Sequence, residues 1–115
     1  MDATTMQAIR TRLEGELASV EHQLEENGVT PGTDEVHLPI EEGFADSAQA
    51  TTERSAILSL IEQLQTTHRE VAAALHRMEE GTYGKCEGCG QEIASERLEA
   101  VPTARQCVTC KQAAR

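Results

Sequence analysis

The sequence predicts a mainly α-helical chain, built as an antiparallel helical hairpin followed by a small module that carries all the cysteines. Two long stretches have apolar residues at spacings of three and four, which is the period of an amphipathic helix. A connection containing glycine and proline separates them. With one tyrosine, one phenylalanine and no tryptophan in 115 residues, we do not expect a large packed core.

The first predicted helix runs from about Thr4 to Glu26. Its apolar residues fall on one stripe of the helix surface: Met6, Ile9, Leu13, Leu17, Val20 and Leu24. Asn27-Gly28 predicts the end of this helix, because glycine readily takes the left-handed conformation that closes a helix.

The second predicted helix begins near Asp46 or Ser47 and ends at Glu80-Gly81. A heptad seam runs along it, with Leu60 beside the seam, and is apolar except at His68: Ile57, Ile61, Leu64, His68, Val71, Leu75 and Met78. At a rise of 1.5 Å per residue this helix is about 50 Å long, too long for a compact globule of this size. We therefore expect residues 1–80 to form an antiparallel coiled-coil hairpin with a tip loop around 28–45. His68 lies on the seam, and we interpret it as a residue that either tunes register or points its ring to the edge of the seam, rather than as a ligand or a switch.

The connection between the helices is unusually long for a helical hairpin, and loops of this length are either disordered or functional. Its end clusters Glu41, Glu42 and Asp46 around Phe44. Two interpretations stay open: a solvated loop with an acidic helix cap, or an acidic tip that approaches a cation or a basic wall.

The cysteines form two motifs, Cys86-Glu-Gly-Cys89 and Cys107-Val-Thr-Cys110. Each motif can place two thiolates on one side of a tight turn, and together they complete the tetrahedral S₄ shell that Zn²⁺ prefers. Gly88 and Gly90 permit the positive φ that such a turn often needs. We therefore predict one closed, structural zinc ion, bound by all four cysteines.

Other uses of the cysteines fit less well. The N-terminal residues show neither a cationic segment nor an apolar one, so nothing directs the chain to an oxidising compartment where two disulfides would form. A redox-active Cys-x-x-Cys usually follows a strand of a βαβ unit, whereas here the motifs follow a long helical pattern. A catalytic zinc keeps one position open for water, and four cysteines close the shell.

Residues 81–115 complete the predicted module. Between the motifs, Ile93, Leu98 and Val101 are expected to form a small core around a helical turn and a proline-set return. Residues Lys111 to Arg115 are expected to extend Cys110 into a short C-terminal helix.

The charge is strongly uneven. The formal net charge is −10; residues 1–80 carry sixteen acidic and five basic side chains, and residues 81–115 carry four and five. An acidic stalk repels phosphates, so DNA and RNA are poor partners, and a basic protein surface or channel suits it better. Most of these acids can also simply solvate exposed helices.

No apolar run approaches the ~20 residues that span a bilayer, so we expect no membrane association and a cytoplasmic location. No catalytic constellation is present, so we expect no enzymatic activity.

The run from Gly81 to Lys111 resembles the DksA/TraR C4-type zinc-finger family. The shared features are an aromatic-Gly-x-Cys entry, a Cys-Gly-x-x-Ile step, the return Arg97-Leu98-x-Ala100-x-Pro102 and a Cys-x-x-Cys-Lys exit. The resemblance covers about a quarter of the chain. It implies an antiparallel coiled-coil hairpin followed by a C4 zinc-finger module with a short C-terminal helix.

The same resemblance implies a partner and a mode of action. Members of the family bind bacterial RNA polymerase and not DNA. Their zinc end lies at the rim of the secondary channel, and the acidic hairpin tip reaches towards the catalytic magnesium and alters promoter-complex stability. This implies a polymerase-binding regulator, which we expect to be monomeric.

Two positions depart from the family pattern. The tip motif is Asp-x-x-Asp-x-Ala; Asp46 and Ala48 match its later positions, Gly43 replaces the first aspartate, and Glu42 is an imperfect substitute. Members that respond to the alarmone guanosine tetraphosphate have an arginine where this chain has Val101, although Lys111 keeps the basic residue after the last cysteine as a phosphate or partner contact. We therefore expect weak or absent alarmone dependence.

The leading hypothesis is thus a transcription regulator of RNA polymerase, with Asp46, Ala48 and Glu42 as its tip effector. The alternative is a zinc-finger adaptor of the same family, whose degenerate tip has no direct transcriptional activity. A thiol oxidoreductase is a third interpretation, which thiol titration without a chelator distinguishes.

Overall fold

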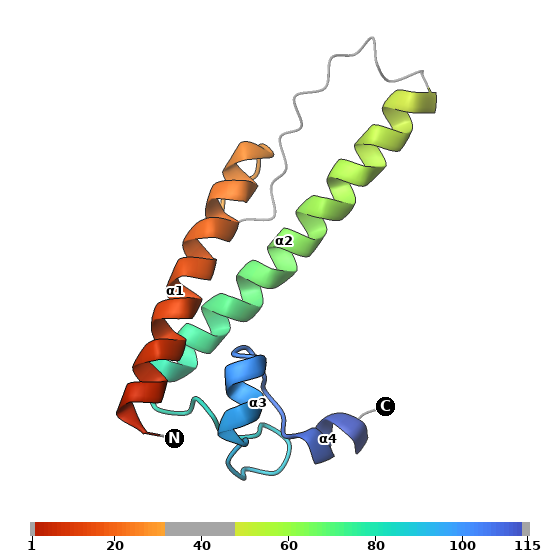
Figure 1. Cartoon of the computed structure of the whole chain (residues 1–115). Helices are drawn as coiled ribbons and strands as arrows, with labels where there is room; N and C mark the ends of the chain where they lie inside the picture. Colours follow the sequence, from red (N-terminus) through yellow and green to blue (C-terminus); the bar gives the residue numbers. More distant parts are fainter. Residues whose placement is uncertain (1, 32–47, 114–115) are drawn as a thin grey trace. The chain divides into compact units, whose positions relative to one another are not determined.

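The computed structural model describes residues 2–31 and 48–113, and helices make up most of this part of the chain (Figure 1). They are α1 (Ala3–Glu26), α2 (Ala48–Glu80), α3 (Ser95–Ala100) and α4 (Val108–Ala113). The predicted mainly α-helical fold class is confirmed. Within the described ranges, no helix has both the length and the apolar composition needed to cross a membrane.

The ends of α1 are set by local hydrogen bonds. The Asp2 carboxylate accepts a 2.7 Å hydrogen bond from the backbone N–H of Thr5, and this bond lowers the pKa of Asp2. At the other end Gly28 has a φ of +81°, and the N–H of Val29 donates to the carbonyl of Leu24 at 2.9 Å. The predicted end at Asn27-Gly28 is therefore confirmed, since this is how a left-handed glycine closes a helix.

Helix α2 ends in the same way. Gly81 has a φ of +78°, and the N–H of Thr82 donates to the carbonyl of Arg77 at 2.9 Å. The predicted C-terminal end at Glu80-Gly81 is confirmed. The predicted start at Asp46 or Ser47 lies outside the described residues, and the described helix begins at Ala48.

The chain forms two compact units, one of residues 1–16 and 70–115 and one of residues 17–69. In the second unit α1 and α2 run antiparallel and share a buried apolar cluster of Val20, Leu24, Val29, Ile61 and Leu64. The imidazole Nε2 of His68 lies 3.2 Å from Oε2 of Glu21, and its side chain is 15% exposed. His68 thus forms a polar contact across the pair, and its effect on register stays a prediction.

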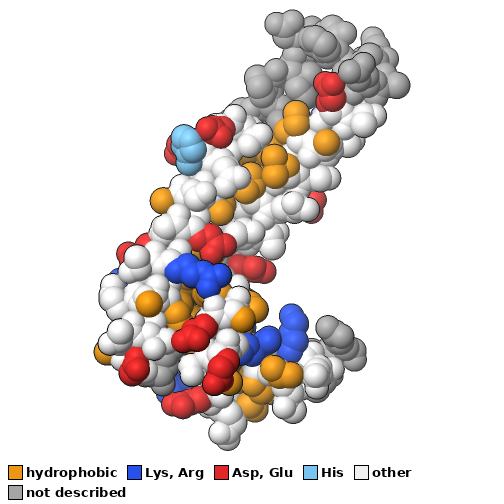
Figure 2. Space-filling model, viewed as in Figure 1, with side chains coloured by type: hydrophobic (Ala, Val, Ile, Leu, Met, Phe, Trp, Pro, Cys, Tyr) orange, Lys and Arg blue, Asp and Glu red, His pale blue; other side chains and the backbone are white. Residues whose placement is uncertain are grey.

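The apolar seam of α2 extends beyond the buried cluster. Ile57 is 37% exposed and Leu60 is 43% exposed, although the heptad pattern includes or adjoins both. The exposed fractions rise on the N-terminal side of Ile61, the last α2 residue of the cluster in that direction. Hydrophobic side chains accordingly reach the surface of this unit (Figure 2).

The first unit combines the remaining parts of α1 and α2 with residues 81–115. Ile9 and Leu13 of α1 are buried, as are Val71 and Ala74 of α2. The boundary predicted at residue 80, between a hairpin and a zinc module, stays a prediction. The unit contains all four cysteines and the short helices α3 and α4.

Candidate metal centre

The first cysteine motif lies on a tight turn. Its flanks form an isolated antiparallel bridge between Lys85 and Glu92, and the N–H of Cys86 donates to the carbonyl of Gln91 at 2.8 Å. Gly90 has a φ of +75°, and its N–H returns to the carbonyl of Cys86 at 2.9 Å. This left-handed glycine closes the turn.

Gly88 allows the main chain to pass close to the sulfurs. Its N–H donates to the Sγ of Cys86 at 3.3 Å, as expected for a backbone group that stabilises a thiolate. A Cβ at Gly88 would lie only 3.0 Å from the Sγ of Cys110 and 3.7 Å from that of Cys86. A side chain at position 88 would therefore press against the Sγ of Cys110, which would have to move by a few tenths of an ångström.

The second motif brings the other two sulfurs to the first. The four Sγ atoms of Cys86, Cys89, Cys107 and Cys110 all lie within 4.8 Å of one another, and all four thiols are free. The Sγ atoms of Cys89 and Cys107 are 3.8 Å apart. In a tetrahedron with Zn–S bonds of about 2.3 Å, neighbouring sulfurs are about 3.8 Å apart. The cluster is therefore consistent with one structural zinc ion, as predicted.

The thiols are electrostatically unequal when no metal is bound. Backbone hydrogen bonds, chiefly that from Cys107, lower the pKa of Cys86 to about 6. Hydrogen bonds with the other thiols, chiefly with Cys86, raise the pKa of Cys110 to about 12. Zinc binds thiolates, so metal binding must release protons from this cluster and acidification must weaken it.

A small core supports the centre. Ile93 is 5% exposed and Leu98 is 1% exposed, as predicted, and they are joined by Tyr83 and Ala104. Val101 was predicted to be a core residue, and this is wrong: its side chain is 44% exposed. It follows the last residue of α3, in an irregular segment where no periodicity indicates which side chains point inward.

Three side chains brace residues 81–115, here called the finger, by donating hydrogen bonds to main-chain carbonyls. The donors are Arg12 Nη1 to Glu99 O at 2.7 Å, Tyr83 Oη to Pro102 O at 2.7 Å, and Arg97 Nε to Gln106 O at 3.0 Å. These contacts are not predictable from the sequence, because they join residues 9 to 87 positions apart and follow no periodic pattern. The available signal was indirect: a lone tyrosine and two arginines beside apolar positions need polar partners.

Comparison with known proteins places these features in a family. Residues 81–115 match the family model of the prokaryotic dksA/traR C4-type zinc finger. General stress protein 16O of Bacillus subtilis is 38% identical over 100 residues, which are 87% of this chain and 58% of that protein. The RNA polymerase-binding transcription factor DksA of Caulobacter vibrioides is 36% identical over 69 residues, which are 60% of this chain and 49% of that protein.

A solved structure extends the similarity along the chain. Transcription factor DksA2 from Pseudomonas aeruginosa is 30% identical and matches with a TM-score of 0.55, over 92% of this chain and 70% of that one. The chain belongs to the DksA/TraR C4-type zinc-finger family. It spans about half to three fifths of the length of the two curated relatives described above.

The expected tip of this DksA/TraR protein is not part of the described structure. Glu42 and Asp46 lie outside the described residues, as does Gly43. Ala48 is the first residue of α2, and its side chain is not described. The role of these residues as a tip effector stays a prediction.

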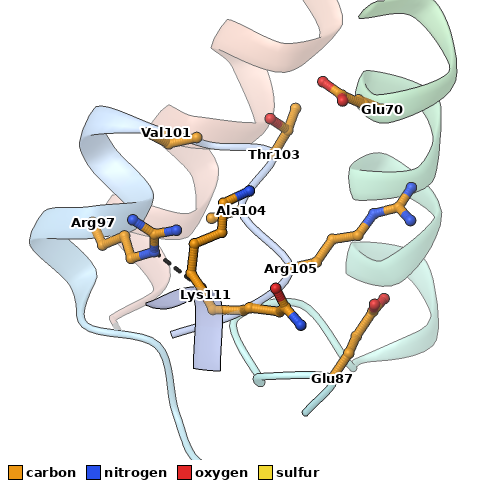
Figure 3. A pocket seen from close by; sticks show the side chains of 9 residues that line it. Glu70, Glu87, Arg97, Val101, Thr103, Ala104, Arg105 and Lys111 are labelled. Carbon is orange, nitrogen blue, oxygen red and sulfur yellow. Dashed lines mark hydrogen bonds between the residues drawn. The ribbon is translucent and has the colours of Figure 1, made fainter. Parts of the chain in front are cut away.

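Lys111 of the DksA/TraR finger lines a surface hollow of about 340 Å³ in the first unit (Figure 3). The lining is Glu70, Glu87, Arg97, Val101, Thr103, Ala104, Arg105, Gln106 and Lys111. Arg77 lies near it, and burial, followed by the charge of Arg105, lowers the pKa of its guanidinium. The hollow therefore brings three cations and two carboxylates together on a chain that is acidic overall, and basic side chains gather beside α4 (Figure 2).

Proposed function

We propose that this chain is a bacterial, cytoplasmic, non-enzymatic transcription regulator that binds RNA polymerase directly. It acts at the secondary channel and modulates promoter-complex stability through its hairpin tip, without binding DNA. The observation that carries the proposal is the four-cysteine centre, whose finger matches a family in which a relative is named an RNA polymerase-binding transcription factor. The chain acts as a monomer.

In this proposal the ligands of the zinc ion are Cys86, Cys89, Cys107 and Cys110. A closed shell of four thiolates leaves no open position for water or substrate, so the metal holds the finger together and does no chemistry. Zinc binding contributes on the order of 10 kcal/mol in small zinc modules, more than this small core supplies. Metal loading is therefore a condition for presenting the partner surface.

The charges favour a protein partner over a nucleic acid. Residues 1–80 carry an excess of eleven acidic side chains, which disfavours contact with phosphates. The hollow beside Lys111 is mixed, since Glu70 and Glu87 accompany its three cations. In this proposal Lys111 contacts the polymerase, and the acidic tip approaches a cation inside the polymerase.

The tip is tested by Asp46→Ser with a matched control, Asp34→Ser, which removes the same charge elsewhere in the long connection. Purified polymerase is pulled down by each protein, and promoter-complex lifetime is measured in parallel. We expect all three proteins to bind, and Asp46→Ser alone to lose most of the effect on lifetime. Loss of binding in Asp46→Ser would mean that the interface is elsewhere than the finger and stalk.

The adaptor function remains a second candidate, because Gly43 stands where the family has its first tip aspartate. An adaptor predicts no change in promoter-complex lifetime with the wild-type protein, with or without polymerase binding. Equal lifetimes in the presence of wild type and Asp46→Ser, at matched occupancy, would favour it. A mobility shift with promoter DNA alone would contradict both candidates.

A further inference from the structure

The second cysteine motif has few supports of its own. Cys107 lies directly before α4, a helix of six residues, and helices this short are marginal by themselves. Val108, the first residue of α4, is 51% exposed, so its side chain contributes little burial. The position of Cys107 therefore depends on contacts that come from outside α4.

One such contact comes from the side chain of Arg97. Its Nε–H donates a 3.0 Å hydrogen bond to the carbonyl oxygen of Gln106, the residue immediately before Cys107 (Figure 3). The next residue along α3, Leu98, is 1% exposed. The donor thus projects from a turn of helix that is anchored in the small core.

Helix α3 is also held at its C-terminal end. Nη1 of Arg12 donates to the carbonyl of Glu99 at 2.7 Å, which satisfies one of the carbonyls that a helix end leaves unpaired. The N–H of Val101 donates to the carbonyl of Arg97 at 2.7 Å. All these residues belong to the first compact unit. The base of the Arg97 side chain is therefore fixed before it reaches Gln106.

We propose that Arg97 is a positioning residue of the metal centre. Its Nε–H fixes the main chain before Cys107 and so places the Cys107 thiolate against that of Cys89, 3.8 Å away. The inference rests on the ligand set of the proposed function. Removal of a group that orients a ligand typically lowers metal affinity about 10–100-fold. Loss of the Arg97 donor should loosen the second motif and leave the first in place.

Glutamine provides a matched test of the donor. The Nε2 atom of glutamine is the same number of bonds from Cα as the Nε of arginine, so Arg97→Gln keeps the donor and removes the charge. Arg97→Lys keeps the charge and moves the nitrogen one bond farther from Cα. Arg97→Met keeps a long side chain and removes both. Arg105→Met is the control, because it removes a guanidinium from the same hollow without touching the bond to Gln106.

The measurement is the rate at which zinc leaves the full chain for an excess of a coloured chelator. We expect release from Arg97→Met to be about 10-fold faster than from wild type. Arg97→Lys should fall between them, and Arg97→Gln and Arg105→Met should stay close to the wild-type rate. The absorption bands of bound Co²⁺ give a second readout, since they report tetrahedral thiolate geometry. They should change in Arg97→Met and return in Arg97→Gln.

Two results would overturn the role of Arg97: wild-type release from Arg97→Met, or equally fast release from Arg97→Gln and Arg97→Met. If Arg97→Met does not fold, the comparison of the glutamine and lysine variants decides. Slower zinc release from Arg97→Lys than from Arg97→Gln would show that the charge at position 97 holds the metal centre and the Nε–H donor does not. A wild-type protein without zinc would refute the ligand set as well. No polymerase is needed, so failure of the proposed partner leaves this test unaffected.

Discussion

The phenolic oxygen of Tyr83 donates a 2.7 Å hydrogen bond to the carbonyl oxygen of Pro102, and both residues are buried. This contact ties the segment that enters the first cysteine motif to the segment that returns to the second. Tyr83 is also the only tyrosine in a chain without tryptophan. One side chain is therefore both a brace of the finger and its spectroscopic reporter.

Substitution of Tyr83 by phenylalanine should weaken the finger. The change leaves the buried carbonyl of Pro102 without its donor, which costs about 1–3 kcal/mol. We expect faster amide hydrogen exchange at Leu98, which lies in the same core. The control is Thr82→Ala at the exposed neighbouring position. Equal exchange rates in the wild-type protein and in Tyr83→Phe would show that the bond does not contribute to local stability.

Alkaline titration should show the burial of the same phenol. Burial raises the pKa of Tyr83 above its ordinary value of 10.0. Above pH 10 the unfolded chain loses this proton while the folded chain keeps it, so stability falls as the pH rises towards the folded pKa. Tyrosinate absorbance should therefore have a midpoint above pH 10 in the folded protein, and nearer 10 in denaturant. A folded midpoint below 10 would contradict the buried position.

Removal of the metal should unfold the finger and spare the long helices. We expect about one zinc per chain in the purified protein, and Cys107→Ser should disorder residues 82–115. The loss of helical circular dichroism should be small, because α3 and α4 contribute six residues each while α1 and α2 contribute 24 and 33. Collapse of most of the helical signal, or two disulfides in fresh protein, would refute this prediction.

Gly88→Ala should disturb the metal centre through sterics alone. Its new Cβ would lie 3.0 Å from the Sγ of Cys110, closer than real Cβ atoms normally come to a neighbour. We expect zinc release to quicken by about 10-fold or more. Gly15→Ala is the control, because a Cβ there meets nothing within 4 Å and a helical alanine should add about 1 kcal/mol of helix stability.

Guanosine tetraphosphate should bind weakly or not at all in the hollow beside Lys111. Val101 lines it with an uncharged, 44% exposed side chain, and Glu70 and Glu87 offset its cations. With purified polymerase, the alarmone should add little to the effect of the wild-type protein on promoter-complex lifetime. Val101→Arg restores the charge that responsive family members carry at this point, and should increase the response. Strong potentiation of the wild type is the contradicting outcome.

The helix ends and the cysteine cluster were predictable because their causes are local. Gly28 and Gly81 close their helices with positive φ values, and paired cysteines need only short turns to converge. The length of the α2 seam that other side chains bury was not predictable. Periodicity identifies the apolar face of a helix, but it does not tell how far the partner helix covers that face, and Ile57 and Leu60 are consequently exposed.

The finger interior was predicted only in part, for a different reason. Between Leu98 and Cys107 the chain has no repeating pattern, so the inward residues depend on tertiary packing. Ala104 is buried in this stretch, whereas the larger Val101 faces the hollow. The apolar character of a residue is a weak guide in a module this small, where the metal replaces much of the core.

The three braces of the finger all end on main-chain oxygen atoms, those of Glu99, Pro102 and Gln106. Every amino acid has a carbonyl group, so these bonds leave the residue types at the acceptor positions 99 and 106 unrestricted, whereas positions 12, 83 and 97 each need a side chain that donates from the same place. In a library of all single substitutions, each acceptor position should thus tolerate more residue types than the donor position that it is bonded to. Such an asymmetry lets the outer surface of the finger diversify towards new partners while its architecture is inherited unchanged.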